Sequence, residues 1–143
     1  MPISISETLD ALRARAAEEG LTGLRVTNAQ LPAAIGDRLE QFLDRQHHGD
    51  MSWLEERKQQ RRSPHALWSE ARSAIILAQP YTPDMDLLDR LSHKDTGVIS
   101  VYALNRDYHD VFKGKLKRLA AWIHQYTDEQ VKIFVDTAPL MEK

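Results

Sequence analysis

The stretch YHDVFKGKLKRLAAWIHQYTDEQVKIFVD, residues 108–136, contains the two patterns that decide the fold class. Apolar residues recur along its first part at the spacing of one helix face, at Tyr108, Val111, Phe112, Leu116, Leu119, Ala120 and Ile123. The segment VKIFV, residues 131–135, then alternates β-branched residues with Lys132 and Phe134, which is typical of a strand with one strongly apolar face. A long helix followed by a strand predicts a fold that combines helices with a sheet.

Shorter patterns on the N-terminal side predict further elements. We expect helices over residues 5–19 and from Pro32 to near Gly49, and strands over 23–29, 73–81 and 97–103. Residues 82–97 are polar and are expected to form a loop that could bend over a site. Together these elements predict one α+β domain over residues 1–143, an α/β sandwich whose central mixed sheet is flanked by helices. The strand order stays open.

The composition limits the class of protein. The chain has 143 residues, 42% of them hydrophobic, and a net charge of -2 that argues against holding nucleic acid by bulk electrostatics. The absence of cysteine excludes a disulfide framework, a thiolate zinc site, a cysteine nucleophile and iron–sulfur ligation within these residues. Because no apolar run approaches a membrane span and the N-terminus lacks a signal-peptide pattern, we expect a cytoplasmic location and no membrane partner.

Asp136 is a candidate for chemistry because it directly follows the predicted strand 131–135. Catalytic groups often lie at strand ends, since the strand is rigid and its end opens into a crevice. If Asp136 is desolvated there, its protonated form is favoured and the carboxyl group can donate a proton. The alternative is that Asp136, followed by Thr137 and Pro139, only caps a helix beginning at the last residues. The residues by themselves favour the cap.

A second candidate is RDYHDVF, residues 106–112, at the expected junction between a strand and the long helix. Asp107 stands in the N-cap position, and a helix N-terminus presents backbone N–H groups and partial positive charge to a ligand. The alternative is a capped helix with Tyr108 packed inward and His109 on the surface. That alternative is favoured by this motif taken alone.

Basic residues gather in ERKQQRRSPHALW, residues 56–68, as Arg57, Lys58, Arg61 and Arg62. Such a run suits phosphates or a polyanionic cofactor tail, although it is more often a solvated helix face. The six histidines, including the His47–His48 pair, lack i, i+4 spacing with a carboxylate partner, so we expect no metal site. The sequence contains no GxSxG, Walker or GxGxxG motif.

Five blocks follow one another along the chain: HGDMSWL beginning at His48, RxxP beginning at Arg61, ARSAI, RDYH and VDTAP, within a similarity that covers the chain from about residue 22 to the end. In this order and at these spacings they resemble the N-terminal domain of the epoxyqueuosine reductases. That family resembles the reductive dehalogenases and uses base-off cobalamin with two 4Fe–4S clusters. It reduces epoxyqueuosine to queuosine at the wobble position of the tRNA anticodon, in the cytoplasm. The resemblance therefore implies an oxidoreductase of tRNA processing whose partners are cobalamin and a tRNA carrying epoxyqueuosine.

The resemblance also implies roles for single residues. Asp136 matches the aspartate proposed as proton donor to the opened epoxide, beside the cofactor, while Arg61 and Ser100 match positions that contact cobalamin, Ser100 through its backbone. The wall of the site is matched by Tyr102, Asp107, Tyr108 and His109.

The family continues after VDTAP with the rest of the cobalamin pocket and a cysteine-rich ferredoxin-like domain. We therefore expect residues 1–143 to be the incomplete N-terminal part of a catalytic domain, monomeric and inactive alone. The alternative is a stand-alone module that binds cobalamin or tRNA and works with a separate iron–sulfur partner, such as a separately encoded C-terminal half. A third hypothesis is a decayed gene product without function.

Overall fold

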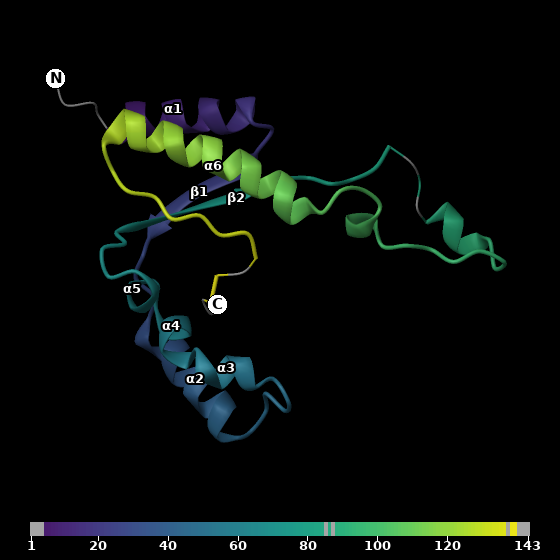
Figure 1. The fold of residues 1–143 in the computed structure, drawn as a ribbon, viewed down its shortest axis with the longest axis horizontal. Helices are drawn as coiled ribbons and strands as arrows, with labels where there is room; N and C mark the ends of the chain where they lie inside the picture. Colours follow the sequence, from purple (N-terminus) through teal and green to yellow (C-terminus); the bar gives the residue numbers. More distant parts are fainter. Residues whose placement is uncertain (1–4, 85, 87, 137, 140–143) are drawn as a thin grey trace. The chain divides into compact units, whose positions relative to one another are not determined.

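The computed structural model describes residues 5–84, 86, 88–136, 138 and 139 (Figure 1). Along the chain they form α1 (Ile5–Glu18), β1 (Thr22–Asn28), α2 (Ala33–Asp44), α3 (Ser52–Glu56), α4 (Lys58–Arg62), α5 (Pro64–Leu67), β2 (Ser73–Ala78), the 3-10 helices η1 (Asp89–Ser92) and η2 (Val101–Ala103), and α6 (Tyr108–Thr127). The chain divides into a first unit, residues 1–24 and 77–135, and a second unit, residues 25–76 and 136–143.

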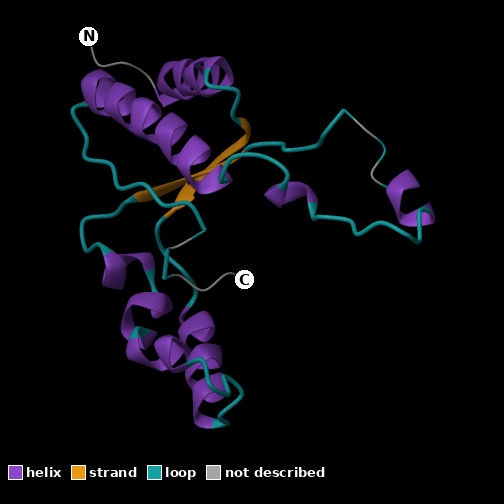
Figure 2. Cartoon of the chain, turned by 45° about the vertical axis from the view of Figure 1, so that its right-hand side comes forward, coloured by secondary structure: helices purple, strands orange, loops and turns teal. Residues whose placement is uncertain are grey.

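The strands β1 and β2 pair with each other in a two-stranded sheet, drawn in orange in Figure 2. The two strands run antiparallel. The Thr22 hydroxyl, at the start of β1, donates to the Ala78 carbonyl at the end of β2 at 3.2 Å, and the Ala29 N–H, just after β1, donates to the Arg72 carbonyl, just before β2, at 3.0 Å. Gly23 has a φ of +63°, and a Cβ there would lie 3.3 Å from the Ala78 Cβ. Glycine is therefore favoured at this position by its positive φ, and the Ala78 methyl leaves little room for a side chain.

In the first unit, α1 lies beside α6, as Figures 1 and 2 both show. Leu12 and Ala16, one turn apart on α1, are buried, and so is Leu119 on α6. These helices are amphipathic with a narrow apolar stripe, so their packing against each other is what stabilises both.

The second unit is built on α2, which contacts α4, and α4 in turn contacts α5. Ile35, Leu39 and Leu43 follow one another at i, i+4 spacing on α2 and are all buried. The Arg62 side chain lies over Gly36, where its Nε would be 3.2 Å from a Cβ, and pairs with Glu40. The small residue at position 36 thus lets α4 approach α2 closely.

Locally encoded elements agree with the sequence prediction. Helices expected over 5–19 and from 108 form as α1 and α6, and strands expected over 23–29 and 73–81 form as β1 and β2. The helix expected from Pro32 to near Gly49 forms as α2 but ends at Asp44. The predicted α+β class is confirmed.

Two predicted strands and the sheet they were to build are wrong for the described residues. Residues 97–103 contain η2, and residues 131–135 carry no strand ladder, so the described chain holds a two-stranded antiparallel sheet in place of a central mixed one. Burial over 131–135 still alternates as expected, ending at buried Val135. The alternation predicts which side of an extended segment is apolar, but a strand also needs a neighbouring backbone to pair with.

Candidate functional site

The predicted site residues are divided between the two units. Ser100, Tyr102, Asp107, Tyr108 and His109 belong to the first unit, whereas Arg61 and Asp136 belong to the second.

Asp107 caps the N-terminus of α6, as the sequence predicts. Its Oδ1 accepts the backbone N–H of His109 at 2.9 Å and lies 2.8 Å from Nδ1 of the His109 ring. The backbone N–H, and after it the imidazole, hold the pKa of Asp107 below its ordinary value. The cap and the ring therefore share one carboxylate oxygen, which fixes the His109 side chain at the start of the helix.

Three aromatic rings next to this cap contact one another in sequence. The His109 ring stacks on Tyr108 with centroids 4.1 Å apart, and Tyr108 meets the edge of Tyr102 at 6.4 Å. Tyr102 is exposed and Tyr108 and His109 are partly buried. The structure thus brings three of the predicted wall residues together in one aromatic row.

Ser100 precedes η2 in the N-cap position with extended backbone angles. Its carbonyl oxygen accepts the N–H of Ala103 at 2.9 Å, so one acceptor of its backbone closes the 3-10 turn. The segment around it was expected to be a strand, and the turn is the arrangement found instead.

Arg61 lies on α4 with its guanidinium carbon 4.8 Å from the ring centroid of Trp53 on α3. This is the geometry of a cation–π contact. Its Nε is buried and has no hydrogen-bond partner among the described residues. The next residue, Arg62, is by contrast held by Glu40 and by Asp37.

Asp136 is exposed and has a left-handed backbone, with φ of 54°. The strand that was expected to precede it is not formed, and the expected desolvation of its carboxyl group is not found in the described part of the chain. Asp is one of the few residues that adopt positive φ at modest cost, so the type of residue at this position suits the backbone as well as the proposed chemistry. Thr137, named above with the helix cap, lies outside the described residues.

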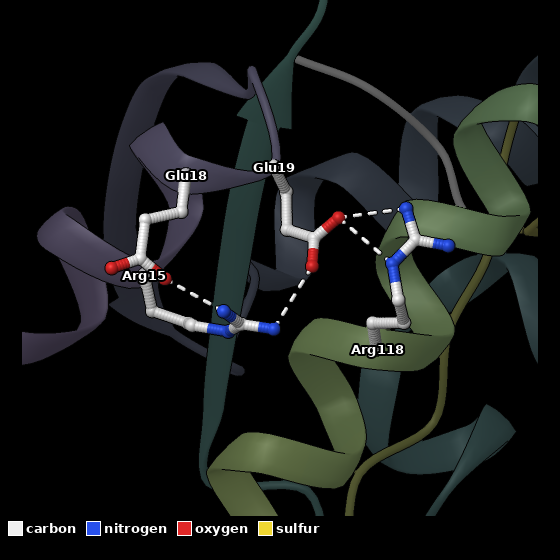
Figure 3. Close-up of polar contacts among 4 residues, drawn as sticks. All are labelled: Arg15, Glu18, Glu19 and Arg118. Atoms are coloured by element: carbon white, nitrogen blue, oxygen red, sulfur yellow. Dashed lines mark hydrogen bonds and ion pairs between the residues drawn. The ribbon is translucent and has the colours of Figure 1, made fainter.

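Sequence reasoning missed the charged cluster that joins α1 to α6, which Figure 3 shows in close-up. Arg118 of α6 donates to Glu19 from Nε at 2.9 Å and from Nη2 at 2.7 Å, and Arg15 donates to the other Glu19 oxygen at 3.0 Å. The Glu19 side chain is only 10% exposed. The Arg118 hydrogen bond is the main cause that lowers the pKa of Glu19. No local pattern indicates this pair, because its members are 99 positions apart.

Trp53 was also missed, although its signal was present. It stands eight positions before Arg61, a little over two helical turns, although the helix breaks between them at Arg57. Among the described residues, no group of three or more His, Asp or Glu side chains is placed to hold a metal ion. Nor does any helix in the described ranges combine the length and apolarity that crossing a membrane would take.

The resemblance implies cobalamin as the cofactor, and Arg61 is the described residue whose chemistry suits it. Cobalamin carries phosphate and amide oxygens, which accept hydrogen bonds from a guanidinium group. Arg61 fits this chemistry, because its guanidinium is fixed against a ring and has donor capacity that the described residues leave unused.

Comparisons with known proteins agree with one another. Residues 61–137 match the family profile described as "Epoxyqueuosine reductase QueG, DUF1730". The epoxyqueuosine reductase of Salmonella typhimurium is 30% identical over 99% of this chain and 37% of its own length, and that of Escherichia coli is 28% identical over 99% and 38%. That of Cellulophaga algicola is 33% identical over 94% and 42%. The chain thus spans about two fifths of the length of these relatives, and no solved structure gives a significant match.

Proposed function

Because the chain belongs to the epoxyqueuosine reductase family, we propose that it forms the part of such an oxidoreductase that binds cobalamin and the epoxyqueuosine of a tRNA, in the cytoplasm. One observation carries this proposal. The matched range, residues 61–137, contains every residue to which the resemblance assigns a role, from Arg61 through Ser100 and the Asp107 cap to Asp136. The family name supports queuosine biosynthesis, and the cofactor and the residue roles are part of the proposal.

Asp136 is proposed as the proton donor. When a C–O bond of the epoxide breaks, negative charge develops on the oxygen, and a carboxyl group at that oxygen supplies the proton it needs. Asp136 is exposed in the described chain, and covering by substrate and by further parts of the protein would favour its protonated form. Its left-handed backbone fixes the direction in which the side chain leaves the main chain.

Arg61 and Ser100 are proposed to hold the cofactor, Arg61 by its guanidinium and Ser100 by its backbone. Bound cobalamin would supply the electrons, which no amino-acid side chain can provide. The aromatic row of Tyr102, Tyr108 and His109 is proposed as the wall against which the substrate base lies.

The chain by itself is proposed to be inactive and monomeric. Returning electrons to the cofactor takes a redox centre, and iron–sulfur clusters need ligands of the cysteine type, which these 143 residues do not contain. The reduction would then depend on residues supplied elsewhere.

Two measurements test this function. In an absorption titration of the purified chain with cobalamin, we expect a saturable spectral change that is weakened by Arg61→Ala and retained by Asp136→Asn. In an Escherichia coli strain that lacks its own reductase, we expect the chain alone to leave epoxyqueuosine in tRNA, measured by mass spectrometry of nucleosides. Titration without any spectral change would reject the cofactor role, and robust queuosine formation would reject the inactivity.

A second candidate function is a binding module that works with a separate iron–sulfur partner. The observation in its favour is the exposure of large apolar side chains in the described part of the segment that connects β2 to α6. Large apolar side chains are exposed there at Tyr81, Leu88, Leu91, Val98, Ile99 and Tyr102. An apolar surface of this kind is typical of a region that another polypeptide covers. Co-purification of the tagged chain with a cysteine-rich protein from its own cells would favour this function.

A further inference from the structure

The short helices α3 and α4 place Trp53 and Arg61 against each other. Arg57 ends α3 and caps α4, and its φ of -111° and ψ of 20° depart from helical values. The Arg61 N–H donates to the Arg57 carbonyl at 3.1 Å across the first turn of α4, and the Arg61 guanidinium carbon lies 4.8 Å from the Trp53 ring centroid. The Trp53 side chain stays half exposed, so it is not a core residue.

Arg61 and its neighbour Arg62 have different roles in the second unit. Arg62 is a structural residue, since it lies over Gly36 and pairs with Glu40 and Asp37. Arg61 has neither an ion pair nor a side-chain hydrogen bond within the described part of the chain, and its Nε is buried. The Trp53 ring is therefore the contact found to orient this guanidinium.

A guanidinium held over a ring loses less conformational entropy when it binds a ligand than one that moves freely in water. The contact with the ring uses none of the N–H groups as donors, so the Nη groups remain able to donate to a ligand. The pair thus has the features of a preformed hydrogen-bond donor.

We propose that Trp53 is a positioning residue that holds the Arg61 guanidinium for hydrogen bonds to the phosphate or amide oxygens of cobalamin. The inference rests on the proposed function for the identity of the ligand. It assigns to Trp53 a role in cofactor binding that acts through Arg61 and needs an aromatic face, not merely apolar bulk.

The test is an absorption titration of the full 143-residue chain with cobalamin, for the wild type and four variants. Trp53→Leu removes the ring but keeps apolar bulk, and we expect the dissociation constant to rise about 3- to 10-fold. Trp53→Phe keeps an aromatic face and should restore most of the affinity. Arg61→Ala should weaken binding as well, and adding Trp53→Leu to Arg61→Ala should have no further effect, because the ring then has nothing to orient.

A second readout works without cofactor. The Arg61 Nε–Hε resonance of the wild type should show the upfield shift of a proton near an aromatic ring. This shift should be lost in Trp53→Leu and largely kept in Trp53→Phe, while the melting temperature changes little because Trp53 is half exposed.

The outcomes separate this inference from the function on which it rests. Unchanged cobalamin affinity in Trp53→Leu, with clear binding by the wild type, would overturn the positioning role and leave the cofactor role intact. Equal losses in Trp53→Leu with and without Arg61 would also overturn it, since Trp53 would then act independently. Absence of cobalamin binding by the wild type would overturn both.

Discussion

Asp136 combines an acidic side chain with a backbone conformation that few residues adopt. At its φ of 54°, most side chains cost roughly 1–2 kcal/mol relative to glycine, while Asp and Asn are tolerated better. The choice of replacement therefore decides what a mutation measures. Asp136→Ala would change acidity and backbone strain together, whereas Asp136→Asn removes the acid and keeps a residue suited to left-handed backbone.

We expect Asp136→Asn to lower reduction without loss of cofactor binding. A suitable protein is a chimera in which this chain replaces the matching part of the Escherichia coli relative. Removal of a general acid should lower queuosine formation by about 10²- to 10⁴-fold, while the cobalamin titration stays unchanged. Turnover at the chimera's own rate in the Asn variant would reject the proton-donor role.

The adjacent arginines should separate stability from binding. Arg62→Gln removes the pairs with Glu40 and Asp37, so it should lower the free energy of unfolding by roughly 0.5–1 kcal/mol, as expected for partly exposed ion pairs. Arg61→Gln should leave the free energy of unfolding unchanged and weaken cobalamin binding. Urea denaturation gives the free energy of unfolding of each variant, and an absorption titration gives its affinity for cobalamin. The reverse pattern would exchange the roles assigned to the two residues.

At the scale of elements, α1 and α6 are joined by the Glu19–Arg118 pair, and this makes their packing sensitive to acid. Arg118 lowers the pKa of Glu19 in the folded chain, so the contribution of Glu19 to stability is complete above the ordinary value of 4.5 and is lost as pH falls through the lowered folded value. We expect Glu19→Gln to lose stability at neutral pH and to show a shallower loss below pH 4.5 than the wild type.

Thermal unfolding followed by circular dichroism over this pH range checks the prediction. Asp10→Asn is the matched control, because it removes an exposed pair with Arg13 inside α1. Glu19→Gln and wild type with parallel pH profiles would contradict the assigned role.

The α6 cap gives a prediction of the same kind. Asp107→Ala leaves the His109 N–H without its side-chain acceptor, so it should lower the melting temperature, whereas Asp107→Asn should retain most of the cap. Since the pKa of Asp107 is lowered in the folded chain, the difference between wild type and Ala variant should shrink as pH falls below the ordinary value of 3.8. Equal melting temperatures of all three proteins at neutral pH would show that the cap does not stabilise α6.

Features that depend on residues close together in the sequence could be predicted from it, whereas features that depend on distant partners could not. The start of α6 and its Asp107 cap depend on neighbouring residues, so apolar spacing and a capping residue suffice to predict them. Residues 97–103 and 131–135 have strand-like patterns, but forming a strand depends on a partner that their own letters do not specify. The Trp53–Arg61 contact lies between these cases, since its spacing is local but passes a helix break at Arg57.

At the scale of the whole molecule, exposed apolar side chains recur along the segment that connects β2 to α6. Leu88, Leu91 and Ile99 are more than half exposed, which is unusual for large apolar side chains so close in sequence. We expect the triple variant with Asn at these positions to bind less of the dye ANS than the wild type, with little change in melting temperature. Leu12→Asn, at a buried position of α1, is the contrasting control that should destabilise the chain. Unchanged dye binding in the triple variant would contradict the exposure of these three side chains to solvent.

The separation of Glu19 from Arg118 by 99 positions has a consequence for synthesis. At about 5–20 residues per second, the ribosome needs roughly 5–20 s to reach Arg118 after it has added Glu19. During that interval Leu12 and Ala16 on α1 have no α6 to pack against. Codon choice over residues 20–118 therefore sets how long a nascent apolar helix is presented to chaperones before its partner emerges.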